Sequence, residues 1–412
     1  MKHQKRVLQV FHSLGMGGAE TWLLRVVKYW KQQEHSKIQV DFLITSGEKS
    51  ILDSSFEMLG AEIFYIPLRR GTVYSFVIKF RKLLKNRSYC AVHDHQDFLS
   101  GWHLLFGLGL LPPVRIIHVH NPIYQLYENY GISLKRRFQS KFGKTLIKLL
   151  ATHIGGTSEK LLEEYEINKD NFPKQWVHAL YCAFSPLDWI GDHITSKAEI
   201  CKEEGWPLQT KLILFAGRFD NSLSLTHPQN HKNSVLALLI FEACTREKDV
   251  RMVMAGANDY IRTEFQELIV SKGLGDKVHQ LGIRQDMPRL MLAASVLLFP
   301  SRAEGLGMVA VEAQAAGLPV LASTSVPDEC VVIKELVHFM NLAEPVTKWA
   351  DALINILEVP RKRYTENDQR WQNSGFNIQI CCSVLEHLYK GLLPKNREIY
   401  HVSIITPQNK SD

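Results

Sequence analysis

The chain has 412 residues, 45% of them hydrophobic, with 49 Lys and Arg against 42 Asp and Glu, a formal net charge of +7. This length and apolar content allow two domains with separate cores and exclude a disordered or fibrous protein. The seven cysteines include no C-x-x-C pair, so neither a disulfide framework nor a zinc pattern is present and a reducing cytoplasm is expected. The longest apolar run, 102–111, is far shorter than the ~20 residues that cross a bilayer, and no transmembrane segment is predicted.

The first half of the chain alternates buried-strand patterns with helical patterns. Strands are predicted at 7–11, 40–45, 62–66, 91–95, 114–119 and 152–156, and helices at 19–32, 51–59, 73–85 and 159–165. This β-α-β rhythm indicates a parallel sheet with helices on both faces. The aromatic and proline-bearing stretch 181–189 interrupts the rhythm and is the predicted linker.

A second β-α-β series follows the linker. Its strands are predicted at 212–216, 251–255, 278–281, 296–300 and 320–323. We therefore expect an α/β fold of two doubly wound, Rossmann-like domains that face each other across a cleft. The first is predicted at 1–185 and the second at 186–380, followed by a C-terminal helix and frayed tail at 381–412. Ligands of such sheets bind beyond the carboxyl ends of the strands.

Two glutamates eight positions apart lie where the predicted strand 296–300 gives way to a helix. Glu304 falls in the loop, and Glu312 lies about two turns along the helix, because a helix repeats every 3.6 residues. Gly305 and Gly307 leave the N–H groups at the helix start uncovered, where an anionic or hydroxyl-rich ligand is attracted. The alternative is a charge that complements the helix dipole and a solvated helix residue.

Two other loops carry groups suited to phosphate. The loop Ser13–Thr21 is rich in glycine, which lets backbone N–H groups approach a phosphate, although Glu20 breaks a full G-x-G-x-x-G. A tight turn that needs positive φ is a compatible reading of this loop. Arg218 and Lys232 follow the strand 212–216, and fixed positive charge of this kind binds a diphosphate without a metal. An ordinary surface charge is the alternative for either residue.

Histidines gather at two predicted strand ends of the first domain. The set His93, Asp94, His95 and His120 could chelate zinc or iron, because alternate residues of a strand share a face. A metal-dependent hydrolase is therefore an alternative function. Packed and hydrogen-bonded histidines are the more common case, and the second domain offers no complementary ligand set.

The stretch 301–320 combines Glu-Gly-Leu-Gly, an alanine-rich helix and a Gly-Leu-Pro-Val exit, and it resembles the E-x7-E signature of the family-four retaining glycosyltransferases of the GT-B fold. The Gly-Gly-Ala-Glu loop at 17–20 resembles the same family. The resemblance covers nearly the whole chain. It implies transfer of a hexose-type sugar, with retention, from a nucleotide diphosphate sugar to a hydroxyl of a glycan or lipid-linked acceptor. Surface polysaccharide synthesis follows by analogy.

The resemblance also implies roles for individual residues. Those implied to be catalytic are His120, Glu304, Arg218 and Lys232. Those implied to bind the donor are Gly17, Gly18, Ile283, Arg284, Gly305, Leu306, Gly307 and Glu312. Glu304 would hold the sugar and Glu312 the ribose, while His120 would serve the acceptor and His118 would point to the opposite face. No cofactor or tightly bound metal is implied, since no clear D-x-D loop is present.

This chain departs from the family pattern in two ways. The segment between Arg218 and Lys232 is longer than usual, and Asn233 follows the lysine where glycine is common. A non-catalytic GT-B scaffold subunit, which would keep the fold, is a further alternative. The presence of the charged set argues against it.

Charge is unevenly distributed along the chain. Residues 1–185 carry 25 Lys and Arg against 15 Asp and Glu, a net +10, which leaves −3 for the remainder. The densest patch, 133–150, has six basic residues, no acidic ones and an apolar stripe at helical spacing. It fits an interfacial helix on anionic lipid at the inner face of the membrane; an ordinary amphipathic helix on the domain core is the alternative. No nucleic-acid reader motif appears, and nucleic acid is not expected as a partner.

Overall fold

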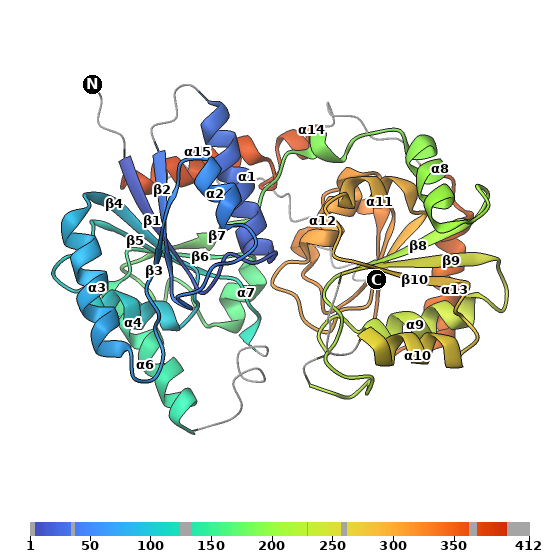
Figure 1. Cartoon of the computed structure of the whole chain (residues 1–412), viewed down its shortest axis with the longest axis horizontal. Helices are drawn as coiled ribbons and strands as arrows, with labels where there is room; N and C mark the ends of the chain where they lie inside the picture. Colours follow the sequence, from blue (N-terminus) through green and yellow to red (C-terminus); the bar gives the residue numbers. More distant parts are fainter. Residues whose placement is uncertain are drawn as a thin grey trace, which may run out of the picture.

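The structure, a computed structural model, describes residues 5–33, 38–123, 134–228, 230–256, 262–361 and 369–393. Two lobes lie side by side, each built on one parallel sheet with helices on both faces (Figure 1). The predicted α/β fold of two doubly wound domains is confirmed. No helix in the described part of the chain combines the length and the apolar content needed to span a membrane.

The first sheet has seven parallel strands in the order β3-β2-β1-β4-β5-β6-β7. They are β1 (Lys5–Phe11), β2 (Ile38–Ile44), β3 (Glu62–Tyr65), β4 (Tyr89–Asp94), β5 (Val114–Val119), β6 (His153–Gly156) and β7 (Trp176–Ala179). The helices are α1 (Gly18–Gln32), α2 (Asp53–Met58), α3 (Val73–Asn86), α4 (Leu99–Phe106), α6 (Leu134–Leu150) and α7 (Glu159–Glu164). The chain order reverses between β1 and β4, the position at which open α/β sheets bind ligands.

The second sheet has six parallel strands in the order β10-β9-β8-β11-β12-β13. They are β8 (Lys211–Ala216), β9 (Val250–Ala255), β10 (Val278–Gly282), β11 (Val296–Phe299), β12 (Val320–Ser323) and β13 (Val337–Met340). The helices of this lobe are α8 (His193–Glu204), α9 (Ser234–Cys244), α10 (Arg262–Ser271), α11 (Met287–Ala293), α12 (Met308–Ala315) and α13 (Val346–Glu358). The reversal lies between β8 and β11, so Arg218 and Glu304 both follow strands at the switch point.

The central strands were predictable because helices cover both of their faces and their residues form continuous apolar runs. The edge strands β7 and β13 lack such apolar runs and were not predicted. Their sequences, Trp-Val-His-Ala and Val-His-Phe-Met, mix polar with apolar residues, and each strand is only partly buried.

The chain crosses between the lobes twice, and the two crossings lie together. In the predicted linker 181–189, which ends in the 3-10 helix η1 (Pro186–Trp189), the Phe184 N–H donates to the Phe376 carbonyl at 3.0 Å. After the short α14 (Gln369–Gln372), α15 (Ile378–Tyr389) returns to the first lobe and packs against α1 (Figure 1). The domain limits 1–185, 186–380 and 381–412 stay a prediction. Helix α15 begins three residues before the predicted C-terminal segment 381–412. Residues 394–412 lie outside the described residues.

Two glycines allow α4 and α6 to pack at short distance. A Cβ at Gly101 would overlap the carbonyl oxygen of Gly143, and a Cβ at Gly143 would overlap the carbonyl oxygen of Phe98. Both obstacles are backbone atoms, which cannot rotate away. This contact fixes α6, the basic helix of the segment 133–150, on the core of the first lobe.

Overpacking usually costs about 1–3 kcal/mol, and alanine gains ~1 kcal/mol over glycine inside a helix. Because the obstacle is backbone, we predict that Gly101→Ala lowers the free energy of unfolding by a net amount of about 2 kcal/mol. The control is Gly15→Ala, where a Cβ meets nothing within 4 Å, and its effect should stay within about 0.5 kcal/mol. Urea unfolding measures both variants, and equal stability of the two would contradict the close helix contact.

Candidate active site

The carboxyl ends of the two sheets meet where the loop after β11 contacts the ends of β5 and β6. The Ser158 hydroxyl donates to the Gly305 carbonyl at 2.6 Å. A Cβ at Gly305 would overlap the carbonyl oxygen of His120 and lie 3.0 Å from Thr157 Oγ1. Glycine is therefore required at 305 by the domain contact itself. Ser158 also caps α7, because its Oγ accepts from the Leu161 N–H at 3.0 Å.

A carboxylate of the second lobe binds the N-terminus of α7 in the first. Glu329 accepts from the N–H groups of Glu159 at 2.8 Å and Lys160 at 2.9 Å, and from the Tyr181 hydroxyl at 2.9 Å. Lys160 Nζ donates to the Ser325 carbonyl at 3.1 Å. The first N–H groups of a helix have no partner within it, so a charged acceptor satisfies them and complements the helix dipole. Glu329 thereby fixes the orientation of the two lobes.

Lys232 and Glu304 form one ion pair, with Nζ and Oε1 2.5 Å apart. The side chains are 28% and 9% exposed, so the pair borders the interior while the lysine stays accessible. Asp220 shapes the loop that presents Lys232, because its carboxylate accepts from the N–H groups of Lys232 at 3.1 Å and Ser234 at 2.6 Å. Two of the four residues predicted to be catalytic are thus in direct contact.

Asn233 adopts the left-handed backbone conformation with φ +55°. Glycine avoids strain there, and asparagine is among the residues that tolerate it best. Its Nδ2 donates to the Pro300 carbonyl at 2.9 Å, so the side chain also holds the loop. The departure from the family glycine therefore preserves the backbone geometry next to Lys232.

Arg218 is exposed at the end of β8. The pKa of His231 is lowered to about 4, first by burial and then by the charges of Arg218 and Lys232. Both cations therefore act on the same region. The two cations predicted to bind the diphosphate therefore contribute to one positive field.

Glu312 on α12 is paired across the lobes. Arg25 Nη2 on α1 lies 2.9 Å from Glu312 Oε1, and its guanidinium lies 5.9 Å from the ring centres of Phe184 and Trp189. Burial raises the pKa of Glu312, and Arg25 opposes this rise. The ribose role of Glu312 stays a prediction, and a bound ribose would have to share this carboxylate with Arg25. The sequence signal for Arg25 is a cation three residues after the buried Trp22 of an amphipathic helix.

The glycine loop before α1 is not the tight turn with positive φ. Gly17 has φ −77°, and Gly18 is not among the residues with positive φ. The Glu20 carboxylate lies over Gly17, where any Cβ would overlap Oε2. Burial raises the pKa of Glu20 to about 7. Gly17 thus makes room for a carboxyl that is half protonated near neutral pH, whereas a Cβ at Gly18 would meet nothing within 4 Å.

His120 lies next to the domain contact. Its backbone N–H donates to Asp97 Oδ1 at 3.1 Å, and its Nε2 lies 2.8 Å from His95 Nδ1. Burial lowers the pKa of His120 to about 3, so the imidazole is neutral near pH 7. This favours a positioning role over proton uptake. The prediction that His118 points away from His120 is wrong, because the two ring centres lie 4.1 Å apart, as alternate strand residues share a face.

Of the predicted hydrolase set, His93, His95 and His120 lie together, but Asp94 does not join them. The Asp94 carboxylate accepts from Ser100 Oγ and His103 Nδ1, each at 2.7 Å, on the other face of β4. Ring nitrogens of His93, His95 and His118 do lie within 4.8 Å of one another, a spacing that could hold a metal. Both ring nitrogens of His95, however, already have partners within the lobe.

The loop after β10 carries Ile283 and Arg284, which were predicted to bind the donor. The Ile283 side chain is 62% exposed there. The Arg284 guanidinium is committed to Asp286 through Nε–Oδ1 at 2.7 Å and Nη2–Oδ2 at 2.8 Å. In the E-x7-E loop, Leu306 is 3% exposed and points into the core, which leaves only its backbone to a ligand. Gly307, with φ +87°, precedes the first residue of α12.

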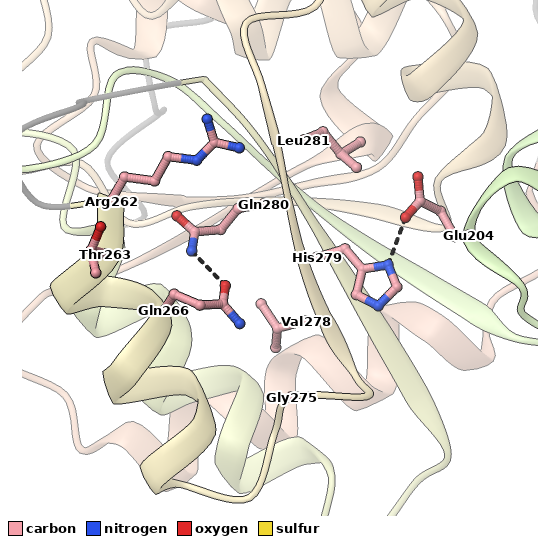
Figure 2. Close-up of a pocket in the computed structure, with 9 residues that line it drawn as sticks. All are labelled: Glu204, Arg262, Thr263, Gln266, Gly275, Val278, His279, Gln280 and Leu281. Carbon is pink, nitrogen blue, oxygen red and sulfur yellow. Dashed lines mark hydrogen bonds and ion pairs between the residues drawn. The ribbon is translucent and has the colours of Figure 1, made fainter.

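Two hollows stand out. A cleft of about 600 Å³ lies between the lobes beside Glu304. Its lining comprises Pro122, Ile123, Lys160 and Glu164 of the first lobe and Arg302, Ala303, Glu304, Thr324 and Ser325 of the second. The other hollow, of about 570 Å³, lies at the outer edge strand β10 (Figure 2). There His279 Nδ1 lies 2.6 Å from Glu204 Oε2, and none of the predicted site residues lines it.

Comparison with known proteins agrees with this arrangement. Residues 196–375 match the family model Glycosyl transferases group 1. The second lobe is thus a glycosyltransferase domain of this group. EpsF of Bacillus subtilis (strain 168), which carries a glycosyltransferase name, is 28% identical over 94% of this chain and 96% of its own. CapH of Staphylococcus aureus, a capsular polysaccharide biosynthesis glycosyltransferase, is 24% identical over 93% and 98%.

Solved structures show the same fold for this glycosyltransferase. Anabaena HepE, crystallised in complex with UDP and glucose, aligns with a TM-score of 0.73 at 17% identity over 95% of this chain and 100% of HepE. Sucrose-phosphate synthase from Thermosynechococcus elongatus aligns with a TM-score of 0.69 at 18% identity over 94% and 98%. Because these sequence identities are only 17% and 18%, the alignments show a shared fold alone.

The raised pKa of Glu20 gives a pH-dependent prediction. Its carboxyl has a pKa of about 7 in the folded protein against an ordinary value of 4.5, so its stabilising contribution is complete below pH 4.5 and is lost as the pH rises to about 7. The slope is at most about 1.4 kcal/mol per pH unit. Glu20→Gln removes this loss, so its stability relative to the wild type should increase from about pH 5 to about pH 7.5.

Urea unfolding across that pH interval measures the difference. The control is Glu166→Gln, which removes a carboxyl whose pKa Lys144 lowers, and it should gain no stability over the same interval. A difference between Glu20→Gln and the wild type that does not change with pH would show that the Glu20 carboxyl is not raised.

Proposed function

We propose that this glycosyltransferase transfers a hexose-type sugar from a nucleoside diphosphate sugar to a hydroxyl of a glycan or lipid-linked acceptor, with retention of the anomeric configuration. The observation that carries the proposal is the Lys232–Glu304 ion pair, 2.5 Å long, at the mouth of the cleft between the lobes. A carboxylate accepts hydrogen bonds from sugar hydroxyls, and an adjacent ammonium binds phosphate oxygens. Both requirements of a nucleotide sugar are thus met at one point.

In this proposal the leaving diphosphate is stabilised by side chains. Lys232 and Arg218 would face the developing negative charge, together with backbone N–H groups at the start of α12. Fixed cations of this kind make a resident metal unnecessary, and none is included. HepE, which has the same fold, was crystallised with UDP and glucose, and this supports a uridine nucleotide as the first donor to test.

The cleft of about 600 Å³ beside Glu304 is the proposed acceptor site. Lys160 and Arg302 offer donors in it, and Glu164 offers acceptors. A mixture of donors and acceptors suits the hydroxyl groups of a glycan. Because both lobes line the cleft, their contact also limits the access of water to the donor.

The proposed pathway is the synthesis of a surface polysaccharide. It is supported by CapH, whose name assigns it to capsular polysaccharide biosynthesis and which matches nearly the full length of this chain. The enzyme would act in the cytoplasm, at the inner face of the membrane.

Contact with anionic lipid is proposed through α6. The side chains of 134–137 lie outside the described residues, but Phe138 is 68% exposed, Phe142 39% and Leu149 71%. Exposed basic side chains flank them at Lys141 and Lys148. Aromatic and basic residues on one exposed helix surface suit an anionic bilayer interface.

Glu304→Ala and Arg218→Ala should each lower the release of UDP from a sugar donor at least ~100-fold, which corresponds to about 2.7 kcal/mol of transition-state stabilisation. Both should retain a normal melting transition. Glu358→Ala, at an exposed position at the end of α13, is the control and should keep full activity. Donors are chosen by screening nucleotide sugars for thermal stabilisation of the wild type. Wild-type turnover in either variant would contradict the site, and a wild type that binds donors without turnover would support the scaffold alternative.

For the membrane contact, the double variant Phe138→Ser/Lys141→Glu should reduce co-sedimentation with vesicles that contain phosphatidylserine by about 10-fold, since both apolar and electrostatic binding are lost. The matched control, Phe339→Ser/Lys334→Glu, makes the same changes at exposed positions of the second lobe. It should bind vesicles as the wild type does. Equal binding of both variants would dismiss α6 as the lipid-binding surface.

A further inference from the structure

A chain of hydrogen bonds runs from α15 through the core of the first lobe to His120. Gln9 Nε2 donates to the Tyr389 hydroxyl at 2.9 Å, and Gln9 Oε1 lies 2.8 Å from His95 Nε2. His95 Nδ1 lies 2.8 Å from His120 Nε2. The Tyr389 hydroxyl is also 2.8 Å from His93 Nδ1. Gln9, His95 and Tyr389 are 0%, 6% and 1% exposed, so water does not compete for these bonds.

The direction of these bonds determines where the protons lie. Gln9 donates through Nε2, so its Oε1 accepts and His95 carries its hydrogen on Nε2. A neutral imidazole has one N–H, and His95 Nδ1 is therefore an acceptor. His120 must then donate from Nε2, which leaves a lone pair on His120 Nδ1. The Tyr389 hydroxyl completes the pattern by donating to His93 Nδ1.

His120 Nδ1 is the free end of this chain. It has no hydrogen-bond partner among the described residues. The unpaired nitrogens His93 Nε2 and His118 Nδ1 are fully buried, whereas His120 Nδ1 is not. His120 is only partly buried, and its carbonyl contacts Gly305 at the junction of the lobes. Its Nδ1 is thus accessible beside the loop that carries Glu304.

The two imidazoles at the end of this hydrogen-bond chain, His95 and His120, stay neutral over the pH range in which the enzyme would work. Burial places the pKa of His95 well below its ordinary value and lowers that of His120 to about 3. The hydrogen bonds, and not the pH, therefore select the tautomer. The residue that links His120 to the buried glutamine is His95.

We propose that His95 is a positioning residue for sugar transfer: held by Gln9 and Tyr389, it keeps His120 in the Nε2–H tautomer and so offers the Nδ1 lone pair to the hydroxyl of the acceptor. This inference rests on the proposed transferase function. An acceptor hydroxyl that donates to Nδ1 keeps its oxygen lone pairs free for attack on the sugar. The opposite tautomer would present an N–H and occupy one of those lone pairs instead.

Helix α15 contributes one residue, Tyr389, to this hydrogen-bond chain. The polypeptide returns from the second lobe to the first near the end of the described residues. There the hydroxyl of Tyr389 bonds to Gln9, which lies 380 positions earlier in the sequence. The hydroxyl of Tyr389 therefore belongs to the hydrogen-bond chain that ends at His120, at the junction of the lobes.

The test is the tautomer of His120, observed through long-range proton–nitrogen correlations in protein labelled with [15N]histidine and assigned with His120→Gln. The Nε2–H tautomer is expected in the wild type. His95→Gln keeps an amide near the position of Nε2 but loses the contact with His120, so a tautomer mixture is expected. His95→Asn keeps an amide near the position of Nδ1 and should preserve the Nε2–H tautomer.

Kinetics with the sugar donor identified by screening form the second readout. His95→Gln should lower kcat about 10-fold or more with an unchanged donor KM, since donor binding does not involve the hydrogen-bond chain. His95→Asn should stay within about 3-fold of the wild type. If His95→Gln does not fold, the tautomer of His120 in the wild type is the deciding measurement, because it needs no variant of His95.

An Nδ1–H tautomer of His120 in the wild type would overturn the inference, and so would wild-type kcat in folded His95→Gln. The NMR readout does not depend on turnover. A protein that converted no nucleotide sugar but showed the Nε2–H tautomer, lost in His95→Gln, would refute the proposed function and leave the hydrogen-bond chain established.

Discussion

The contact of Gly305 with the ends of β5 and β6 is the constraint on which the site depends. Because position 305 has no side chain, the loop after β11 approaches the carbonyl of His120 and receives the hydroxyl hydrogen bond of Ser158. Glu329 strengthens the same junction by binding the free N–H groups of α7. The carboxyl ends of two separate sheets are thereby held face to face, and residues far apart in the sequence line one cleft.

The two lobes place different chemical groups around the contact between Gly305 and His120. The second lobe contributes fixed charges, with Lys232 paired to Glu304 and Arg218 exposed nearby. The first lobe contributes neutral imidazoles, because burial lowers the pKa of His95 and His120. In the proposed reaction, charge stabilisation would fall to the donor side and hydrogen-bond orientation to the acceptor side. This division suits a reaction in which the leaving group is a diphosphate and the nucleophile is a hydroxyl.

The sequence predicted what depends on local pattern. Central strands form continuous apolar runs, and the E-x7-E stretch carries its own helix start, so the fold and the neighbourhood of Glu304 followed. Contacts between distant segments carry no such pattern. Arg25 reaches Glu312 over 287 positions, and Tyr389 reaches Gln9 over 380. The left-handed Asn233 could be recognised as a departure from the family, but its backbone conformation became clear only in the fold.

The most direct test of the account is calorimetric binding of UDP and of UDP-glucose to the wild type, Lys232→Met and Glu304→Gln. If Lys232 binds the diphosphate and Glu304 the sugar, Lys232→Met should weaken both ligands about 10-fold or more, because a charged hydrogen bond is lost in each. Glu304→Gln should weaken UDP-glucose and leave UDP unchanged. Equal effects of Glu304→Gln on the two ligands, or UDP affinity that Lys232→Met does not alter, would contradict this division of the site.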